Sequence, residues 1–228
     1  MKTFAFIFAR GGSKGIPNKN LKKINNISLL EYSIKVAKKS KQIQEVFVSS
    51  DSNQIIKLAN KLNAYTIQRP KHLAQDTSPE WLSWKHAINK IYKKNPFDIF
   101  ISLPTTSPLR STSDVNSVIS KYKSKKPDIL YTINESNRNP YFNMVVKNNN
   151  LISKVIQDKQ FFRRQDAPKT YDLNTVAVVT TPEYINTSPN QFHGNVYGHL
   201  IPNSRSLDID TYLDYKMAKL ILEKNVRK

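Results

Sequence analysis

Three cationic side chains and three glycines crowd into one short segment near the start of the chain. The cations are Arg10, Lys14 and Lys19, and between them lie Gly11, Gly12, Ser13 and Gly15. Glycine lets a backbone approach its ligand closely, exposed amides cradle phosphate oxygens, and cations neutralise phosphate charge. The order of glycines matches neither a Walker loop nor a dinucleotide-binding loop. The segment therefore predicts a triphosphate site, with a flexible turn carrying incidental lysines as the alternative.

Two carboxylates alternate with apolar residues near the other end of the chain. Asp208 and Asp210 flank Ile209 in a strand-like segment. Side chains two residues apart in an extended chain face the same side, so both carboxylates can face one hard cation such as Mg²⁺. The alternative is that Asp210 simply caps the helix expected from residue 210 onward. From the residues alone, the cap is slightly favoured.

Apolar strand-like segments alternate with amphipathic ones over the first half of the chain. Strands are expected at residues 3–9, 45–50, 64–68, 98–103 and 128–133, and helices at 29–39, 52–62, 79–93 and 112–123. This alternation predicts an α/β fold with a doubly wound, mostly parallel sheet. Open sheets of this kind bind ligands beyond the carboxyl ends of their strands, where the glycine-rich segment stands.

The alternating pattern breaks between residues 134 and 174. Residues 141–146 and 151–156 are expected to form a hairpin, followed by a polar and basic stretch. A strand at 176–180 and a closing helix at 210–224 complete the chain. We expect one domain over residues 1–228, with 134–174 inserted as a hairpin and a dimer-contact arm.

Composition narrows the class of protein. The net charge of +19 over 228 residues admits a nucleic-acid-binding protein, but the lysines are spread along the chain rather than gathered on one element. No apolar run approaches the roughly 18 residues of a membrane span. The absence of cysteine excludes disulfides and cysteine-bound zinc, and it agrees with a cytoplasmic location. We expect neither a nucleic acid nor a membrane as partner.

The run from residue 9 to residue 21 closely resembles the signature of the acylneuraminate cytidylyltransferases, the CMP-sialic acid or CMP-nonulosonate synthetases. Further segments of the chain resemble that family in the same order, at residues 49–51, 69–78, 106–110, 163–174 and 206–211. The resemblance implies a nucleotidyltransferase that moves CMP from CTP to the anomeric hydroxyl of a nine-carbon 2-keto acid sugar and releases pyrophosphate. It also implies Mg²⁺ (or Mn²⁺) as cofactor and a homodimer whose arm residues reach across subunits.

The same resemblance assigns roles to individual residues. Nucleotide-binding residues would be Arg10, Gly11, Gly12, Ser13, Lys14, Lys19, Asn20, Arg69, Asp76, Thr77 and Ser78. Sugar-binding residues would be Pro104, Thr106, Ser107, Arg164, Gln165, Tyr171 and Asn174. Asp208 and Asp210 would hold the metal, which favours the metal over the cap at Asp210. These two carboxylates, with Arg10, Lys14 and Lys19, would carry the catalysis.

The chain departs from the family pattern on the sugar side. Pro104-Thr105 stands where the family commonly has Gln-Pro, Asp172 where it has an arginine, and Thr175 where it has a glycine. Because the nucleotide side is intact, we expect a nonulosonate other than plain N-acetylneuraminate, such as a legionaminate- or pseudaminate-type sugar. The rivals are a nucleotidyltransferase for an eight-carbon keto acid or a hexose phosphate, and a basic nucleic-acid-binding protein.

Overall fold

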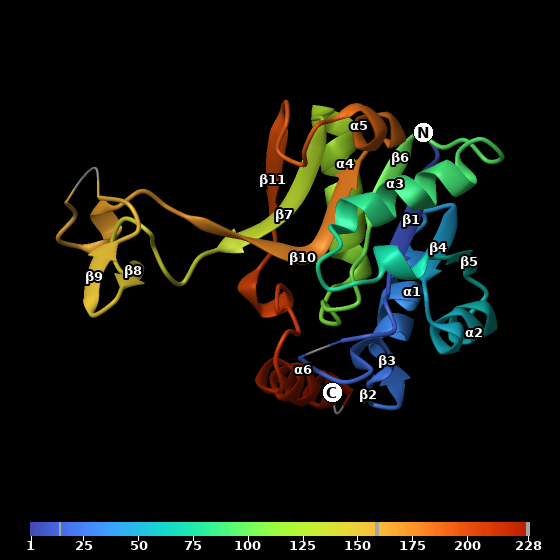
Figure 1. The fold of residues 1–228 in the computed structure, drawn as a ribbon, viewed down its shortest axis with the longest axis horizontal. Coiled ribbons are helices and arrows are strands. Elements are labelled where there is room, and N and C mark those ends of the chain that lie inside the picture. The colour runs from blue at the N-terminus through green and yellow to red at the C-terminus, as the bar shows by residue number, and fades with distance from the viewer. Residues whose placement is uncertain (14, 158–159, 227–228) are drawn as a thin grey trace.

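A seven-stranded sheet forms the centre of the molecule in the computed structural model, which describes residues 1–13, 15–157 and 160–226 (Figure 1). Its strands, in spatial order, are β11 (Val196–Leu200), β7 (Ile129–Glu135), β10 (Tyr171–Thr180), β6 (Ile99–Ser102), β1 (Thr3–Phe8), β4 (Glu45–Ser50) and β5 (Tyr65–Gln68). Strand β10 runs antiparallel to both neighbours, and every other adjacent pair is parallel. The predicted α/β fold with a mostly parallel sheet is confirmed.

Helices cover both faces of the sheet. On one face, α1 (Leu29–Lys39), α2 (Asn53–Lys61) and α4 (Thr112–Lys125) pack on aliphatic strand residues such as Ala5 and Ile7. On the other face, α3 (Glu80–Ile91) and the short α5 (Pro182–Thr187) pack on aromatic residues such as Phe4 and Phe6. Alternate residues of β1 thus enter opposite layers, as the pleat requires, and both layers hold the carboxyl end of β1 in place.

A third, smaller core lies beside the glycine-rich loop. The hairpin of β2 (Lys23–Ile24) and β3 (Ile27–Ser28) packs against α6 (Tyr212–Val226) through Ile24, Tyr215 and Ile209. The Tyr215 hydroxyl also donates a hydrogen bond of 2.6 Å to the carbonyl of Lys23. This core brings the residue 206–211 segment, near the end of the chain, next to the loop that follows β1.

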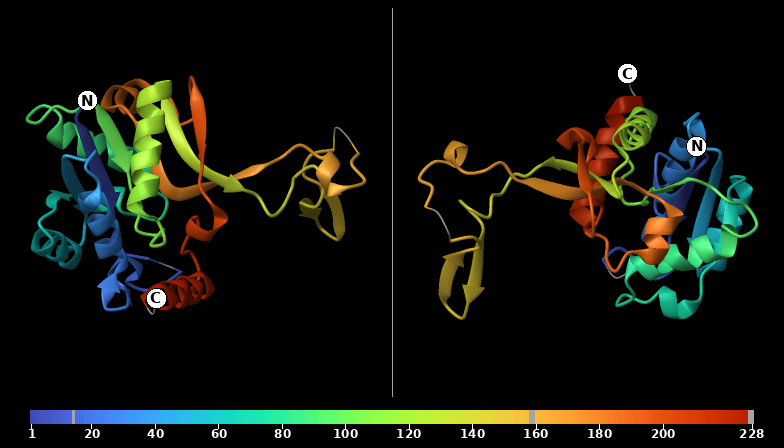
Figure 2. Two further views of the ribbon diagram at one scale, coloured as in Figure 1. Left: turned by 180° about the vertical axis from the view of Figure 1, so that it is seen from behind. Right: turned by 90° about the horizontal axis from the view of Figure 1, so that it is seen from above.

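Strands β7 and β10 run on past the body of the molecule and lead into an arm (Figure 2). Their pairing extends to Tyr171 opposite Glu135, after a bulge in β10 between Leu173 and Val178. The arm ends in the hairpin of β8 (Val145–Asn148) and β9 (Leu151–Lys154). A hairpin was predicted here, but its first strand begins at Val145 rather than at residue 141. The preceding residues instead form a turn, in which three successive amides donate to the carbonyl of Asn139.

Other differences from the expected elements are local. The helix expected from 79 begins at Glu80 with Pro79 outside it, and the closing helix begins at Tyr212 rather than at residue 210. Helix α5, strand β11 and the β2–β3 hairpin were not predicted; each is short, and β11 is an edge strand with largely exposed side chains. Across the described residues, no helix combines the length and apolar character that crossing a bilayer requires.

Candidate active site

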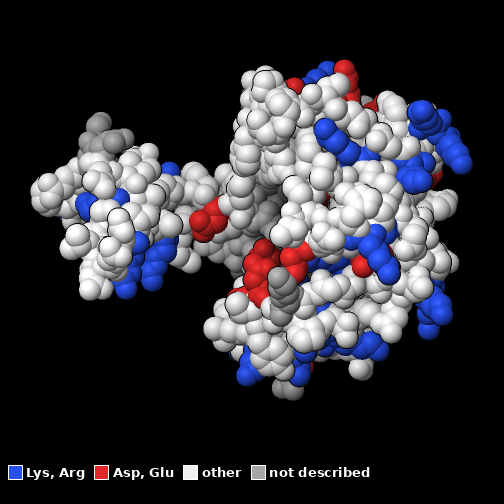
Figure 3. All heavy atoms as spheres, in the orientation of Figure 1, with Lys and Arg blue, Asp and Glu red and all other residues white. Residues whose placement is uncertain are grey.

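A cleft of about 470 Å³ opens beyond the carboxyl ends of β1, β5 and β6. Segments far apart in the sequence line it, and its lining residues include Phe8, Arg10, Ser13, Gly15, Lys19, Asn20, Arg69, Asp76, Ser78, Glu80, Pro104, Thr105, Thr106, Thr175, Asp208 and Asp210. Residues from each of the four sets predicted to bind phosphate, base, sugar and metal therefore share one cavity, although three of the predicted sugar-binding residues lie on the arm. Elsewhere on the face in Figure 3, Lys and Arg side chains are scattered rather than gathered into one basic patch.

Two hydrogen bonds, to Asp51 and from Asn20, hold the glycine-rich loop against this cleft. The amide of Gly11 donates to Asp51 Oδ1 at 2.9 Å. Asn20 Nδ2 donates to the carbonyl of Arg10 at 2.8 Å, and its Oδ1 accepts from the hydroxyl of Thr105 at 2.5 Å. Asn20 is buried, so its amide ties the loop to the segment after β6. Lys14, predicted to bind phosphate, lies outside the described residues.

Two residues predicted to bind nucleotide, Arg10 and Asp76, form an ion pair. The pair joins the loop after β1 to the loop between β5 and α3, and both side chains are about one-third exposed at 34%. Ser78 lines the same cleft, whereas Thr77 is exposed outside the lining residues. The backbones of Gly11 and Gly12 also lie outside that set, and a Cβ built on Gly12 would meet nothing within 4 Å.

Arg69 is buried at the floor of the cleft. Its Nη2 donates to the carbonyl of Ser49 at 2.7 Å and its Nε to Ser49 Oγ at 3.2 Å, while the guanidinium stands 5.5 Å above the Phe8 ring. Burial lowers the pKa of Arg69 to about 10, although nearby Glu80 and Asp51 raise it. The guanidinium therefore stays charged at neutral pH and is held rigidly toward the cleft.

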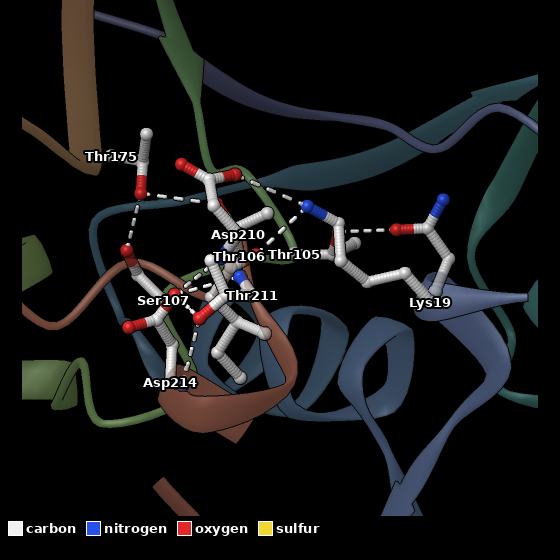
Figure 4. A network of polar contacts seen from close by, with 10 residues as sticks. Lys19, Thr105, Thr106, Ser107, Thr175, Asp210, Thr211 and Asp214 are labelled. Atoms are coloured by element: carbon white, nitrogen blue, oxygen red, sulfur yellow. Dashed lines mark hydrogen bonds and ion pairs between the residues drawn. The ribbon is translucent and has the colours of Figure 1, made fainter. Parts of the chain in front are cut away.

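Asp208 and Asp210 both line the cleft, while Ile209 between them is fully buried on the opposite side. This is the alternation expected of an extended segment. Lys19 Nζ donates to the carbonyl of Ile209 at 2.8 Å and lies 3.4 Å from Asp210 Oδ1 (Figure 4). Gly15 also approaches closely, because a Cβ placed there would stand 2.7 Å from the carbonyl oxygen of Asp210. The glycine-rich loop and the carboxylate segment are thus in direct contact.

The surroundings of Asp208 fit a bound cation. Its Oδ1 is buried and has no hydrogen-bond partner among the described residues. Burial raises the pKa of Asp208 and the charge of Asp210 raises it further, while the hydroxyls of Thr106 and Thr175 oppose the rise through hydrogen bonds. A divalent ion would satisfy the orphaned oxygen and relieve the repulsion. No group of three or more metal-binding side chains exists in the part of the chain that the structure describes, so the side chains there would offer a cation only part of a ligand set.

The helix cap belongs to other residues, and the capping role considered for Asp210 is wrong. Helix α6 begins at Tyr212, and the Thr211 hydroxyl accepts from the amide of Asp214 at 3.3 Å. The Asp214 carboxylate in turn accepts from the amide of Thr211 at 2.7 Å and from the amide of Asp210 at 3.2 Å. This reciprocal arrangement is a capping box, and it leaves the exposed carboxylate of Asp210 turned to the cleft.

Arg110 holds together the segments that carry Pro104 and Thr175 at one side of the cleft. It is buried, and its guanidinium donates to the carbonyls of Val176 and Pro104 and to Ser33 Oγ, the last at 2.8 Å. Burial lowers the pKa of Arg110 to about 9. Its contacts fix the loop after β6 against the β10 bulge, where Thr175 Oγ1 accepts from Thr106 at 3.0 Å and lies 2.7 Å from Ser107 Oγ.

The residues predicted to bind sugar fall into two places. Pro104 and Thr106 line the cleft, and Ser107 is buried behind them. Asn174 is buried in the β10 bulge, where its side chain bonds Asn134 at 3.1 Å and the amide of Val176 at 3.2 Å.

Arg164, Gln165 and Tyr171 lie on the arm. Arg164 and Gln165 line a separate cavity of about 370 Å³, and Tyr171 is the first residue of β10. A single copy of the chain does not bring these three residues into the cleft.

Sequence reasoning missed several cleft residues. Phe8, Glu80, Thr105 and Thr175 line the cavity but were not predicted as site residues. Thr105 and Thr175 did carry a signal, since both stand at positions where the chain departs from the resembled pattern. Glu80 carried none, because it follows a proline at the expected start of a helix, where acidic residues are common.

Comparisons with known proteins find relatives over nearly the whole chain. The profile of a family described as Cytidylyltransferase matches residues 4–217. The chain is 35% identical to post-translational flagellin modification protein B of Campylobacter coli, over 97% of this chain and 95% of that protein. It is 34% identical to CMP-N,N'-diacetyllegionaminic acid synthase of Campylobacter jejuni, over 95% of this chain and 93% of that one.

A solved structure shares the fold. CMP:2-keto-3-deoxy-manno-octonic acid synthetase, in a complex with CTP, superposes with a TM-score of 0.77 over 99% of this chain and all of that chain, at 14% identity. At this identity the likeness establishes the architecture alone.

Proposed function

This chain belongs to the cytidylyltransferase family, and on that premise we propose that it transfers CMP from CTP to the anomeric hydroxyl of a nine-carbon 2-keto acid sugar, releasing pyrophosphate. The observation that carries the proposal is the shared cleft, in which a cationic glycine-rich loop meets Asp208 and Asp210. The similarity to a CMP-N,N'-diacetyllegionaminic acid synthase favours a legionaminate-type sugar. We expect the reaction to take place in the cytoplasm, in keeping with a chain that has no cysteine.

The chain's own residues would position both substrates. Arg10 and Lys19 would neutralise the triphosphate, and Arg69 would hold the base at the floor of the cleft. Nucleotidyl transfer depends chiefly on such positioning and charge stabilisation. Asp208 and Asp210 would hold Mg²⁺ or Mn²⁺, which when bound supplies charge for the phosphate oxygens and favours deprotonation of the attacking hydroxyl.

A homodimer would complete the sugar side of the site. Arg164 and Gln165 lie on the arm, outside the cleft of their own chain. The tip of the arm exposes apolar side chains, with Leu151 79% and Phe162 81% exposed. Such side chains bury readily against another protein surface. A partner subunit that covers them would receive the arm and its polar side chains.

Pyrophosphate release tests the proposal directly. The protein would be incubated with CTP, Mg²⁺ and a panel of acids comprising N,N'-diacetyllegionaminate, pseudaminate, N-acetylneuraminate and 2-keto-3-deoxy-manno-octonate. We expect turnover with the legionaminate-type acid to exceed turnover with the others. Preference for N-acetylneuraminate would contradict the legionaminate assignment, and preference for the eight-carbon acid would contradict the nine-carbon class. Turnover with UTP or GTP but not with CTP would overturn the cytidylyltransferase assignment itself.

A further inference from the structure

Glu80 places a carboxylate in the same part of the cleft as Arg69. It is the first residue of α3 and lines the cavity together with Ser83 of the same helix. Its Oε1 accepts a hydrogen bond of 3.1 Å from Trp84 Nε1, one helical turn further on. Trp84 is itself buried against Phe8 and Phe100, so the indole fixes the carboxylate with respect to the sheet.

Glu80 and Arg69 lie near enough for each charge to shift the pKa of the other. Glu80 is exposed as a residue, yet the groups packed around its carboxylate raise its pKa by desolvation, whereas the Trp84 hydrogen bond and the Arg69 guanidinium lower it. In return, the charge of Glu80 raises the pKa of Arg69, and it has the largest effect of the nearby charges. Yet no hydrogen bond joins the two side chains among the contacts of the described residues. A charged donor and a charged acceptor therefore face one cavity, each fixed from behind by another partner.

We infer that Glu80 is the hydrogen-bond acceptor by which the cleft selects cytosine over uracil, an inference that rests on the proposed function. The two bases differ in one exocyclic group, because cytosine presents the N4 amino group as a donor where uracil presents the O4 carbonyl as an acceptor. An ionised carboxylate can only accept. Glu80 would accept from cytosine N4, as acidic side chains do when they read that base, while Arg69 donates to the ring's acceptor atoms.

Uracil in the same position would place O4 against a carboxylate oxygen. Neither atom can donate, and both would lose their hydrogen bonds to water on entering the cleft. Sites built to pair a polar group reject analogues that leave the group unpaired by large factors. The hydrogen bond from Trp84 to Oε1 restrains the carboxylate, because turning it away from the base would break that bond.

The test compares nucleotide binding by the wild-type protein and by Glu80→Gln. The variant keeps a carbonyl acceptor and adds an amide donor, so its side chain can pair with either base. Calorimetry with CMP and UMP alone measures binding without a sugar acceptor. We expect the wild-type protein to prefer CMP and the ratio of the two Kd values to fall roughly 10- to 100-fold in Glu80→Gln, chiefly through tighter UMP binding. Glu183→Gln, on the exposed side of α5, should keep the wild-type ratio.

A folded Glu80→Gln protein with an unchanged ratio of CMP to UMP affinity would overturn the inference. Glu80→Asp serves as the second variant if the first is unstable. Aspartate is favourable in a first helical turn, but its side chain is shorter by one methylene and withdraws the carboxylate from the base. We expect it to weaken CMP binding more than UMP binding, and equal losses would count against the inference. The turnover assay remains separate. Selective CMP binding without turnover of any nonulosonate would contradict the proposed function and leave the role of Glu80 standing.

Discussion

At the scale of single residues, Asp210 and Asp214 stand four positions apart, but substitutions at the two positions are expected to have different effects. Asp210 is exposed to the cleft, whereas Asp214 closes the capping box of α6. Asp210→Asn should lower Mg²⁺-dependent turnover by two orders of magnitude or more, on the scale of a lost transition-state charge interaction, and leave the free energy of unfolding nearly unchanged. Asp214→Ala should instead cost about 1 kcal/mol of stability and spare most activity. Steady-state kinetics at varied Mg²⁺ and urea unfolding separate the two roles, and a reversed pattern would contradict the assignment.

Gly15 makes one of the contacts between the glycine-rich loop and the carboxylate segment. A methyl group at this position would lie 2.7 Å from the carbonyl oxygen of Asp210, which is backbone and cannot swing aside. Gly15→Ala should therefore lower the free energy of unfolding by about 1–3 kcal/mol, the usual cost of overpacking. Gly12→Ala is the matched control for stability, since its methyl group meets nothing within 4 Å and should change that free energy by less than about 0.5 kcal/mol. If thermal or urea unfolding showed equal losses of stability for the two variants, the close approach of Gly15 to Asp210 would not contribute to the free energy of unfolding.

The sequence predicted those residues whose chemical role can be inferred from their neighbours in the chain. The loop cations and the alternation of Asp208 with Ile209 needed only neighbours in the chain, and they line the cleft as expected except for Lys14, which is not described. Glu80 escaped prediction because its meaning depends on Arg69 and Trp84, which the fold brings around one cavity. The cap of α6 at Thr211 and Asp214 was not predicted, although Thr211-x-x-Asp214 has the spacing of a capping box.

At the scale of elements, one ion pair joins the start of α4 to the segment that leads into Asp208. The Asp114 carboxylate closes the capping box with Ser111 and also accepts two hydrogen bonds from Arg205, in η4 (Asn203–Arg205), at 2.9 Å. Burial by itself would raise the pKa of Asp114, but the hydrogen bonds from Arg205 and Ser111 hold it below its usual 3.8. Strand positions, helix positions and this cross-link together place the carboxylate segment over the cleft.

The depressed pKa of Asp114 makes part of the stability depend on pH. A carboxyl group with a lower pKa in the folded state than in the unfolded state stabilises the protein above about pH 4, and that contribution is lost as the pH falls through the folded-state pKa. Asp114→Asn should therefore cost roughly 2 kcal/mol near pH 7. The difference between wild type and variant should shrink as the pH is lowered below 4. Urea unfolding across pH 7 to 3 measures this, and a difference that does not vary with pH would contradict the role of the charge.

Elements with long periodic patterns were predicted well, and short ones were not. Helix α1 and strand β4 match the expected bounds, because α1 repeats apolar residues at helical spacing and β4 is a short apolar run buried on both faces of the sheet. Strand β11 has no such pattern; its side chains are mostly exposed and it is ordered by backbone pairing with β7. The turn at 141–144 likewise depends on the carbonyl of Asn139, a contact that no period reveals.

At the scale of the whole molecule, the arm is hard to explain for a chain that acts alone. It stands away from the body in every view (Figures 1 and 2), and exposes Leu151 and Ile152 on β9 at 79% and 67%. Burying two such side chains against a partner would contribute about 1.5–3 kcal/mol each. The homodimer proposed above accounts for both the apolar tip and the placement of Arg164 and Gln165 outside the cleft of their own chain.

A substitution that disrupts the tip of the arm should therefore both separate the subunits and abolish turnover. We expect Leu151→Glu to shift the protein from dimer to monomer in size-exclusion chromatography with light scattering, because a charged carboxylate cannot be buried in an apolar contact without a large cost. Turnover should fall because the arm no longer reaches the partner's cleft, while CMP binding, which needs only one chain, should persist. Leu220→Glu makes the same change at an exposed site on α6 and should keep both the dimer and the activity. An active monomeric Leu151→Glu protein would mean that each chain completes its own site and that the arm serves another purpose.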